Sequence, residues 1–351
     1  MKGAAAAAFS ACLVLVALSP AAPAEEPGFA PIALRANPIE QTRLAETADR
    51  YGGALKPLGA LVLSSTDSRF GGLSGLDFAP DGRTFYAVGD KGTWFTARLV
   101  DEDGRMVGIA EPMLAPILDY DGNPVAGSRI ADAEGLRIVR RDGVMTAYVS
   151  FEQASDVRFF AAQPDFAAAL PKRYILPTFV YGVRANFGLE SIAVAPPDSA
   201  LAGAIVLIAE RTLNLEHNHR AFILDGPIVG PFSIRRTDDF DITDAVFMPD
   251  GDLLILERRF RMTEGFAVRI RRIDGAAIAI GATLNGTTLI EADVRDRIDN
   301  MEGMAVTTAD GETLLTLISD DNHNFLQHTM LVRFVLAPKA PPPMPRLRHP
   351  A

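Results

Sequence analysis

The most regular feature of the chain is a short strand pattern that recurs five times. In each copy an acidic or hydroxyl residue precedes a small residue and then a strand with apolar alternate positions, the period of a half-buried β-strand. None of the five segments has the pattern of a helix. The five openings are Ser74-Gly-Leu-Asp-Phe, Glu134-Gly-Leu-Arg-Ile, Glu190-Ser-Ile-Ala-Val, Asp244-Ala-Val-Phe-Met and Glu302-Gly-Met-Ala-Val.

A tight turn and a second strand follow each opening. The clearest turns are Pro80-Asp81-Gly82 and Pro249-Asp250-Gly251, in which glycine supplies the positive φ that a hairpin turn needs. Each second strand ends on another acid. These segments are Tyr86-Ala-Val-Gly-Asp90, Tyr148-Val-Ser-Phe-Glu152, Leu207-Ile-Ala-Glu210, Leu254-Ile-Leu-Glu257 and Thr316-Leu-Ile-Ser-Asp320.

Two more strands complete most of the copies. We expect third strands over 94–100, 157–161, 220–224, 266–273 and 329–336, and fourth strands near 106–110, 173–179, 232–235 and 276–290. The fifth copy has no fourth strand before the proline-rich tail. The segment Leu58 to Ser64, ahead of the first copy, could fill that place and close the sheet edge.

The spacing of the copies predicts an all-β fold, a β-propeller of four-stranded antiparallel blades. The copies begin at intervals of 54 to 60 residues, as propeller blades do. Five blades follow from the count, and a sixth could lie within 30–65. The alternative is a β-sandwich in which the spacing of the acids is coincidental.

The N-terminus has the pattern of a secretory signal peptide. Lys2 precedes an apolar stretch from Ala4 to Leu18, and Ala22-Pro23-Ala24 is a small-x-small cleavage site. A lipoprotein would instead use Cys12, which falls inside the apolar stretch. We therefore expect a periplasmic or secreted protein with a signal peptide over 1–24, an N-terminal extension over 25–54, a propeller over 55–336 and a disordered tail over 337–351.

Composition narrows the range of partners and chemistries. Export would remove the single cysteine, which leaves no disulfide and no thiolate nucleophile. The mature chain would keep 33 basic residues against 44 acidic ones. That balance argues against nucleic acid, and no second apolar stretch points to a membrane. The acidic charge balance is consistent with a protein that binds cations or small molecules.

Blade geometry predicts that the acids meet at one face. The residue that opens the innermost strand and the residue that closes the second strand lie at the same end of a blade. We expect Glu134, Glu190, Asp244 and Glu302 to surround the central axis, with Ser74 in the first blade's place. A second ring would contain Asp90, Glu152, Glu210, Glu257 and Asp320.

Such a ring needs a counter-charge. Two unit charges about 5 Å apart repel by roughly 3 kcal/mol at an effective dielectric of about 20, so either protons or a cation must neutralise them. A set of oxygen ligands suits calcium, which accepts six to eight of them in flexible geometry. Magnesium demands a tighter octahedron, and zinc prefers histidine. Alternatively, each acid caps its own turn or pairs with a neighbouring arginine.

The loops at the same face carry basic residues and histidines. Lys91, Arg211 and Arg258 could hold a phosphate or a carboxylate. His217, His219 and His323 could move protons near a metal-bound water. The alternative is ordinary loop polarity. Trp94, at the start of a third strand, is expected to pack in the core.

Several segments resemble the phytase-like family described by esterase-like activity. The matching segments are Leu73-Ser-Gly-Leu-Asp77, Ala133-Glu-Gly-Leu136, Leu189-Glu-Ser-Ile192, Asn300-Met-Glu-Gly-Met-Ala305 and Leu317-Ile-Ser-Asp-Asp-Asn-His-Asn324. The resemblance covers about 70–336 and implies a propeller and a metal-assisted hydrolase. The dense lysine and arginine clamp of a true phytase is only partly present.

Two functions remain open from the sequence. The first is a calcium-assisted hydrolase of a small anionic ester, either a phosphomonoester, a carboxylic ester or a lactone. The second is a non-catalytic binding or scaffold propeller with a structural calcium ion. The sequence has no Gly-x-Ser-x-Gly nucleophile elbow, no phosphate-binding glycine-rich loop and no dinucleotide fingerprint.

Overall fold

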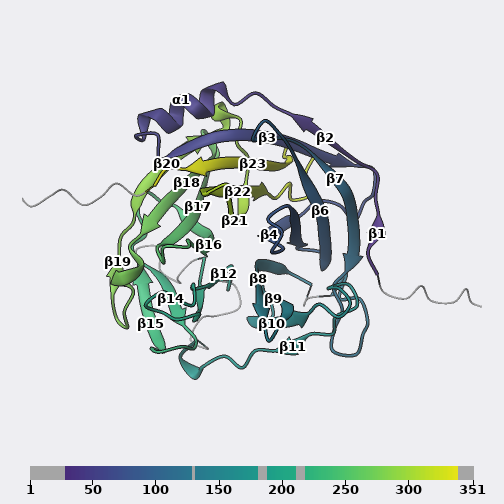
Figure 1. Ribbon diagram of the computed structural model, residues 1–351, viewed down its shortest axis with the longest axis vertical. Coiled ribbons are helices and arrows are strands. Elements are labelled where there is room, and N and C mark those ends of the chain that lie inside the picture. The colour runs from purple at the N-terminus through teal and green to yellow at the C-terminus, as the bar shows by residue number, and fades with distance from the viewer. Residues whose placement is uncertain (1–27, 129–130, 181–187, 211–217, 339–351) are drawn as a thin grey trace, which may run out of the picture.

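The computed structural model describes residues 28–128, 131–180, 188–210 and 218–338. Five sheets, antiparallel except for one short parallel edge strand, are arranged around a central axis with the innermost strands facing that axis (Figure 1). The predicted all-β propeller is therefore confirmed, with five blades. The predicted signal peptide and nearly all of the predicted tail lie outside the described residues.

In each repeat the first strand lies nearest the axis and the later strands lie progressively further out, and strands from the N-terminal segment occupy the outermost positions of blades 1 and 5. Blade 1 contains β4 (Leu73–Phe78), β5 (Thr84–Gly89), β6 (Thr93–Glu102) and β7 (Arg105–Pro116), with β1 (Ala30–Pro31) at its outer edge. Blade 2 contains β8 (Ala133–Arg141), β9 (Val144–Phe151), β10 (Asp156–Ala161) and β11 (Lys172–Arg173). Blade 3 contains β12 (Ser191–Val194), β13 (Ile205–Ile208), β14 (His219–Ile223), β15 (Gly230–Ile234) and the short parallel β19 (Thr283–Leu284).

The last two blades complete the circle. Blade 4 contains β16 (Asp241–Phe247), β17 (Leu253–Arg261), β18 (Gly265–Ile273) and β20 (Thr287–Asp293). Blade 5 contains β21 (Met301–Ala309), β22 (Glu312–Ser319), β23 (Thr329–Leu336), β3 (Leu55–Ser65) and β2 (Leu34–Pro38). The helical segments are α1 (Thr42–Arg50) and the 3₁₀ turns η1 (Thr178–Val180), η2 (Gly275–Ala277) and η3 (Val294–Asp296).

The N-terminal strand closes the ring. β3 pairs antiparallel with β23 over the full length of the latter, from Thr329 opposite Leu63 to Leu336 opposite Leu55. In Figure 1 the purple β3 accordingly lies beside the yellow β23. This pairing confirms the prediction that the segment 58–64 supplies the missing fourth strand, and it covers an edge that would otherwise be open.

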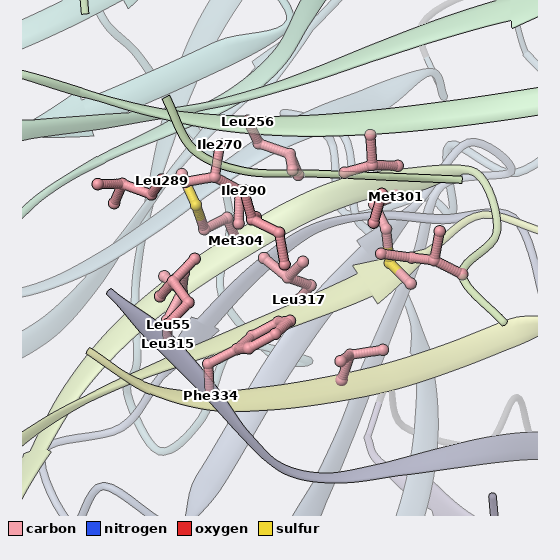
Figure 2. Close-up of a cluster of buried hydrophobic side chains, with 14 of the residues drawn as sticks. Leu55, Leu256, Ile270, Leu289, Ile290, Met301, Met304, Leu315, Leu317 and Phe334 are labelled. Atoms are coloured by element: carbon pink, nitrogen blue, oxygen red, sulfur yellow. The ribbon is translucent and has the colours of Figure 1, made fainter. Parts of the chain in front are cut away.

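Buried apolar side chains fill the space between neighbouring blades. Between blades 4 and 5, Leu256 and Ile270 pack against Met304, Leu317 and other residues of the same cluster (Figure 2). Because a blade packed between two others is covered on both faces, a strand such as β13 is apolar at every position and does not alternate between apolar and polar residues.

Other local expectations are also met. Trp94 is fully buried and stacks on Phe166 with ring centroids 5.3 Å apart, as predicted for a packing residue. The turn glycines Gly82 and Gly251 have φ values of 66° and 88°. Within the described ranges, none of the helices has the length and apolarity needed to cross a membrane.

Candidate functional site

In four of the five blades, the pairing between the first and second strands is irregular at the residue that reaches the central face. The pairing register with the second strand shifts between Met301 and Gly303 in blade 5 and between Ala133 and Leu136 in blade 2. Glu302 and Glu134 lie within these shifts, and Ser74 lies in the equivalent shift of blade 1. Glu190 directly precedes β12 in blade 3.

Blade 4 differs from the prediction by one residue. Its register shift lies between Ile242 and Asp244, so Thr243, not Asp244, occupies the position equivalent to Glu302. Asp244 instead takes the place of the small residue Gly303. The sequence comparison matched acid with acid and could not see the register, so the assignment of Asp244 to the inner ring was wrong.

Asp244 belongs to a buried ion pair. Its carboxylate lies 2.8 Å from the Arg137 guanidinium, and both side chains are at most 4% exposed. The same carboxylate accepts hydrogen bonds of 2.8 Å from the backbone N–H groups of Ala245 and Met304. This pair links blade 2 to blade 4 across the axis, which makes Asp244 a structural residue rather than a free ligand.

The second-strand residues form the outer part of the site. Each donates its backbone N–H to the carbonyl of the residue two positions before the inner-strand residue: Asp90 to Gly72 at 2.9 Å, Glu152 to Asp132 at 3.0 Å, Glu210 to Gly188 at 3.2 Å and Asp320 to Asn300 at 2.9 Å. Four of the five predicted outer acids therefore lie at equivalent places.

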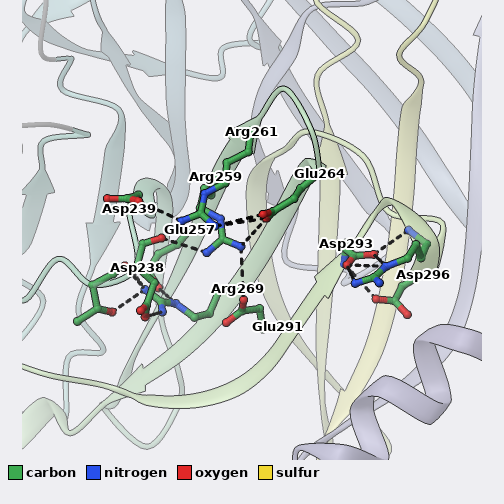
Figure 3. Close-up of polar contacts among 12 residues, drawn as sticks. Asp238, Asp239, Glu257, Arg259, Arg261, Glu264, Arg269, Glu291, Asp293 and Asp296 are labelled. Carbon is green, nitrogen blue, oxygen red and sulfur yellow. Dashed lines mark hydrogen bonds and ion pairs between the residues drawn. The ribbon is translucent and has the colours of Figure 1, made fainter.

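In blade 4 the equivalent residue is Arg258, which lies opposite Asp241 in the pairing of β16 with β17. The predicted acid, Glu257, is one residue away and points to the other side of β17. Its carboxylate is fully buried, 2.8 Å from Arg269 and 2.5 Å from Arg271. Figure 3 shows Glu257 among the charged residues of the β17–β18 hairpin. The placement of Glu257 in the outer ring was therefore wrong.

Arg258 consequently sits among the acids rather than in a loop beyond them. Its guanidinium lies 3.0 Å from Glu302 and 3.3 Å from Glu210, and it donates a 2.9 Å hydrogen bond to Asn300 Oδ1. Asn300 in turn donates to Glu302 Oε1 at 2.9 Å. Arg258 thus places a fixed positive charge on the side of blade 4.

The tightest group of acids lies at blade 2. Asp132, Glu134 and Glu152 offer oxygen atoms that all lie within 4.8 Å of one another. Asp132 was missed from the sequence because it precedes the strand. The signal that could have found it is the alternation Asp132-Ala-Glu134, which places both acids on one side of an extended chain, as Asn300 and Glu302 are.

The blade 2 cluster and the other carboxylates of the central face together form an acid ring. Its members are Asp90, Asp132, Glu134, Glu152, Glu190, Glu210, Glu302 and Asp320. Two glycines allow its close packing. A Cβ atom on Gly188 would collide with the carboxylate of Glu190, and one on Gly72 would collide with that of Asp90.

Burial and mutual repulsion raise the pKa of several carboxyls of the acid ring. Burial raises the pKa of Glu302 to about 8 and that of Asp320 to about 7. Burial and the neighbouring Asp132 raise the pKa of Glu152 to about 7. The pKa values of Glu134 and Glu190 are raised well above the ordinary range, again by burial and then by nearby carboxylates. Perturbed groups of this kind gather where a site must hold charge.

The predicted histidines and basic residues have different fates. His323 lies at the acid ring, with Nε2 3.6 Å from Asp90. His219 is fully buried inside blade 3, its Nδ1 2.8 Å from the Glu210 carbonyl oxygen, and burial lowers its pKa. It does not reach the central face. Lys91 is exposed in the turn after Asp90. His217 and Arg211 lie outside the described residues.

Comparison with solved structures finds 350 matching chains. One is an exo-1,5-α-L-arabinanase from a bovine ruminal metagenomic library, 13% identical, covering 74% of this chain and 92% of its own, with a TM-score of 0.44. Another is the α-L-arabinofuranosidase PaAbf62A from Podospora anserina in complex with cellotriose, 12% identical, covering 80% and 96%, with a TM-score of 0.48. The curated proteins include no match.

A family model provides the assignment. Residues 68–323 match the phytase-like family described as "esterase-like activity of phytase". The matched segment runs from just before β4 to the loop after β22, so it contains every member of the acid ring. Because the match spans well over half of the chain, this protein belongs to the phytase-like family with esterase-like activity, which indicates a hydrolase acting on small molecules.

Proposed function

We propose that this protein is an exported, calcium-assisted hydrolase of a small anionic ester, either a phosphomonoester, a carboxylic ester or a lactone. The observation that carries the proposal is the cluster of Asp132, Glu134 and Glu152, three carboxylates that converge on one point of the central face. Family membership supports hydrolysis, and the predicted signal peptide supports a periplasmic or secreted location.

The donor set fits calcium. Calcium binds oxygen ligands at 2.3–2.6 Å, so oxygens on opposite sides of one ion are about 5 Å apart, consistent with the spread within 4.8 Å. Glu190 is near enough to act electrostatically on both Glu134 and Glu152 and would be a further ligand. The group includes no sulfur or nitrogen donor, which disfavours zinc.

A bound divalent ion would supply Lewis acidity at the ester oxygen and a more acidic water. The chain's own residues would do the rest. Arg258, held in place by Glu302 and Asn300, would orient an anionic group. Lys91, which is exposed in the turn after Asp90, would help to bind the same anionic group. His323, partly exposed beside Asp90, would transfer a proton at Nε2.

The test begins with metal analysis of the purified protein, followed by hydrolysis assays. We expect calcium to copurify, and we expect turnover of nitrophenyl phosphate, nitrophenyl acetate or a lactone that chelation abolishes and calcium restores. Turnover that resists chelation would remove the metal from the mechanism. A calcium-dependent rise in melting temperature without turnover of any ester would instead favour a binding or scaffold protein.

Within this proposal, His323→Asn tests the proton-transfer role. We expect kcat to fall by roughly 100-fold, within the range of general acid–base catalysis, while the calcium affinity measured by calorimetry stays unchanged. An unaltered kcat would exclude His323 from the chemistry.

A further inference from the structure

An apolar groove of about 580 Å³ lies between blades 4 and 5, outside the acid ring. Its walls come from the β17–β18 hairpin, the segment after η3 and the loop that precedes β23. The apolar residues among those that line it are Ile39, Val62, Phe260, Phe266, Val294, Ile298, Leu326 and Met330.

Three of these side chains are exposed to solvent, Val294 to 44% and the other two further. Leu326 is 71% exposed and Phe260 is 58% exposed, although Phe260 contacts Phe266 with ring centroids 4.9 Å apart. Isolated exposed apolar residues are ordinary, but a contiguous group around a groove marks a place where an apolar ligand or surface binds.

The inner end of the groove adjoins the acid ring. Phe260 follows Arg258 by two residues on the regular strand β17, so both side chains leave the same face of that strand. Asp299 lines the groove, and the next residue, Asn300, contacts Arg258 and Glu302. An ester group at the acid ring would therefore lie beside the groove, and an apolar chain attached to it would enter the groove.

We infer that the substrate is a carboxylic ester with an extended apolar acyl chain, whose ester group lies at the acid ring and whose chain occupies this groove. The inference rests on the proposed hydrolase function and narrows it. Hydrolysis adds water across the acyl C–O bond and releases a carboxylic acid and an alcohol. A fully polar phosphomonoester would leave the groove unused, which argues against that class.

Chain length is the direct test. With calcium present, we expect kcat/KM for nitrophenyl acetate, butyrate, hexanoate and octanoate to rise roughly two- to fourfold per added methylene group, as partial to full burial of each group implies. A flat profile with measurable acetate turnover would overturn the inference while leaving the proposed function standing.

Matched surface variants assign the effect to the groove. Leu326→Ser should lower kcat/KM for the octanoate by at least roughly fivefold and leave the acetate unchanged. Phe325→Ser is the control, since Phe325 is the adjacent residue, is 92% exposed and does not line the groove. A second pair uses Phe260→Ser as the test variant and Met262→Ser as its control, since Met262 lies in the same hairpin, is 95% exposed and does not line the groove. Equal effects of Leu326→Ser on both esters would contradict the assignment.

A binding measurement separates this inference from the hydrolase proposal. If no ester is hydrolysed, the proposed function fails, and a fluorescent long-chain fatty acid then tests the groove alone. Saturable binding that is lost in Leu326→Ser and kept in Phe325→Ser would support apolar-chain recognition, and absence of binding would overturn it. Binding to phosphatidylcholine vesicles through Leu326, with no chain-length dependence, would make the patch a membrane-facing surface and would also overturn it.

Discussion

The alternation of side chains along a strand decides which charged residues reach the central face. Glu257 and Arg258 are neighbours in sequence, yet one is buried between two arginines and the other lies among the acids. Thr243 and Asp244 are also neighbours in sequence, yet Thr243 takes the position equivalent to Glu302 while Asp244 accepts a hydrogen bond from the Met304 backbone. A shift of one residue therefore changes a proposed ligand into a structural ion pair.

The cluster at blade 2 gives the first prediction. Glu134→Gln and Asp132→Asn should each lower ester hydrolysis by roughly 100-fold or more, because a calcium ligand is lost. The same changes should raise the melting temperature of the metal-free protein, because they remove repulsion. Kinetics, calorimetric titration and scanning calorimetry would measure these effects.

A matched control for these variants is Glu312→Gln, at the end of β22 remote from Ser319 and the central face. It should alter neither activity nor calcium affinity. If Glu134→Gln retained full calcium affinity, the site would have to be sought elsewhere on the face.

The buried pair of Arg137 and Asp244 gives the second prediction. Asp244→Asn should lower the free energy of unfolding by roughly 3–5 kcal/mol, because it leaves a buried guanidinium without its counter-charge. Calcium affinity should be unchanged. Replacing both residues, as Arg137→Met with Asp244→Leu, should recover part of the stability in urea unfolding. Lost calcium affinity at unaltered stability would restore Asp244 as a ligand.

At the scale of strands and blades, the ring depends on one pairing that spans nearly the whole sequence. β3 supplies the outer partner of β23, with Ala60 opposite Val332. α1 packs behind it, with Leu44 and Ala48 in the core shared by blades 4 and 5. The N-terminal segment is thus a structural part of blade 5.

Truncation tests that closure. A chain that begins after Pro31 loses the short β1, which pairs through two residues at the edge of blade 1, and Phe29, which contacts Tyr86. It should still fold, with a melting temperature within roughly 10 °C of the parent. A chain that begins after Ser65 lacks β2 and β3 and should aggregate through the open edge of β23. Size-exclusion chromatography and circular dichroism would decide. A monomeric, folded product from the longer truncation would show that closure is dispensable.

The sequence predicted the elements because each blade repeats a strong local pattern. Strand, turn and acid recur at a nearly constant interval, and the missing strand of the last blade required an N-terminal partner. The register bulges that fix Thr243 and Arg258 depend on pairing between strands, which one sequence does not reveal. Asp132 likewise becomes a site residue only when the start of β8 is placed opposite Glu152.

For the molecule as a whole, the fold gathers negative charge at one place, and among the described residues Arg258 lies within ion-pair distance of two of those acids. The surrounding blades largely exclude water from Glu190 and Glu302, which are 7% and 8% exposed. At neutral pH, the acid ring without a bound cation therefore costs free energy, because burial penalises the ionised form of each carboxyl and neighbouring carboxylates repel one another. A protein that uses this ring as a metal site would be less stable without the metal.

The last prediction concerns pH. The carboxyls of Glu302, Glu152 and Asp320 have ordinary pKa values of 4.5, 4.5 and 3.8 and folded values of about 8, 7 and 7. The folded state thus binds more protons than the unfolded state over this window, so the stability of the metal-free protein should fall as pH rises from about 4 to about 8. Its melting temperature should drop by roughly 5 °C or more between pH 5 and pH 8.

Calcium should weaken this dependence. At a concentration 100 times its dissociation constant, a bound ion adds about 2.7 kcal/mol, so the melting temperature at pH 8 should rise by roughly 5 °C or more. In Glu302→Gln the metal-free fall should be smaller, because one of the three titrating groups is gone. A metal-free protein whose stability rises between pH 5 and pH 8 would mean that Arg258 and the backbone already neutralise the ring, and the argument for a cation would then lose its physical basis.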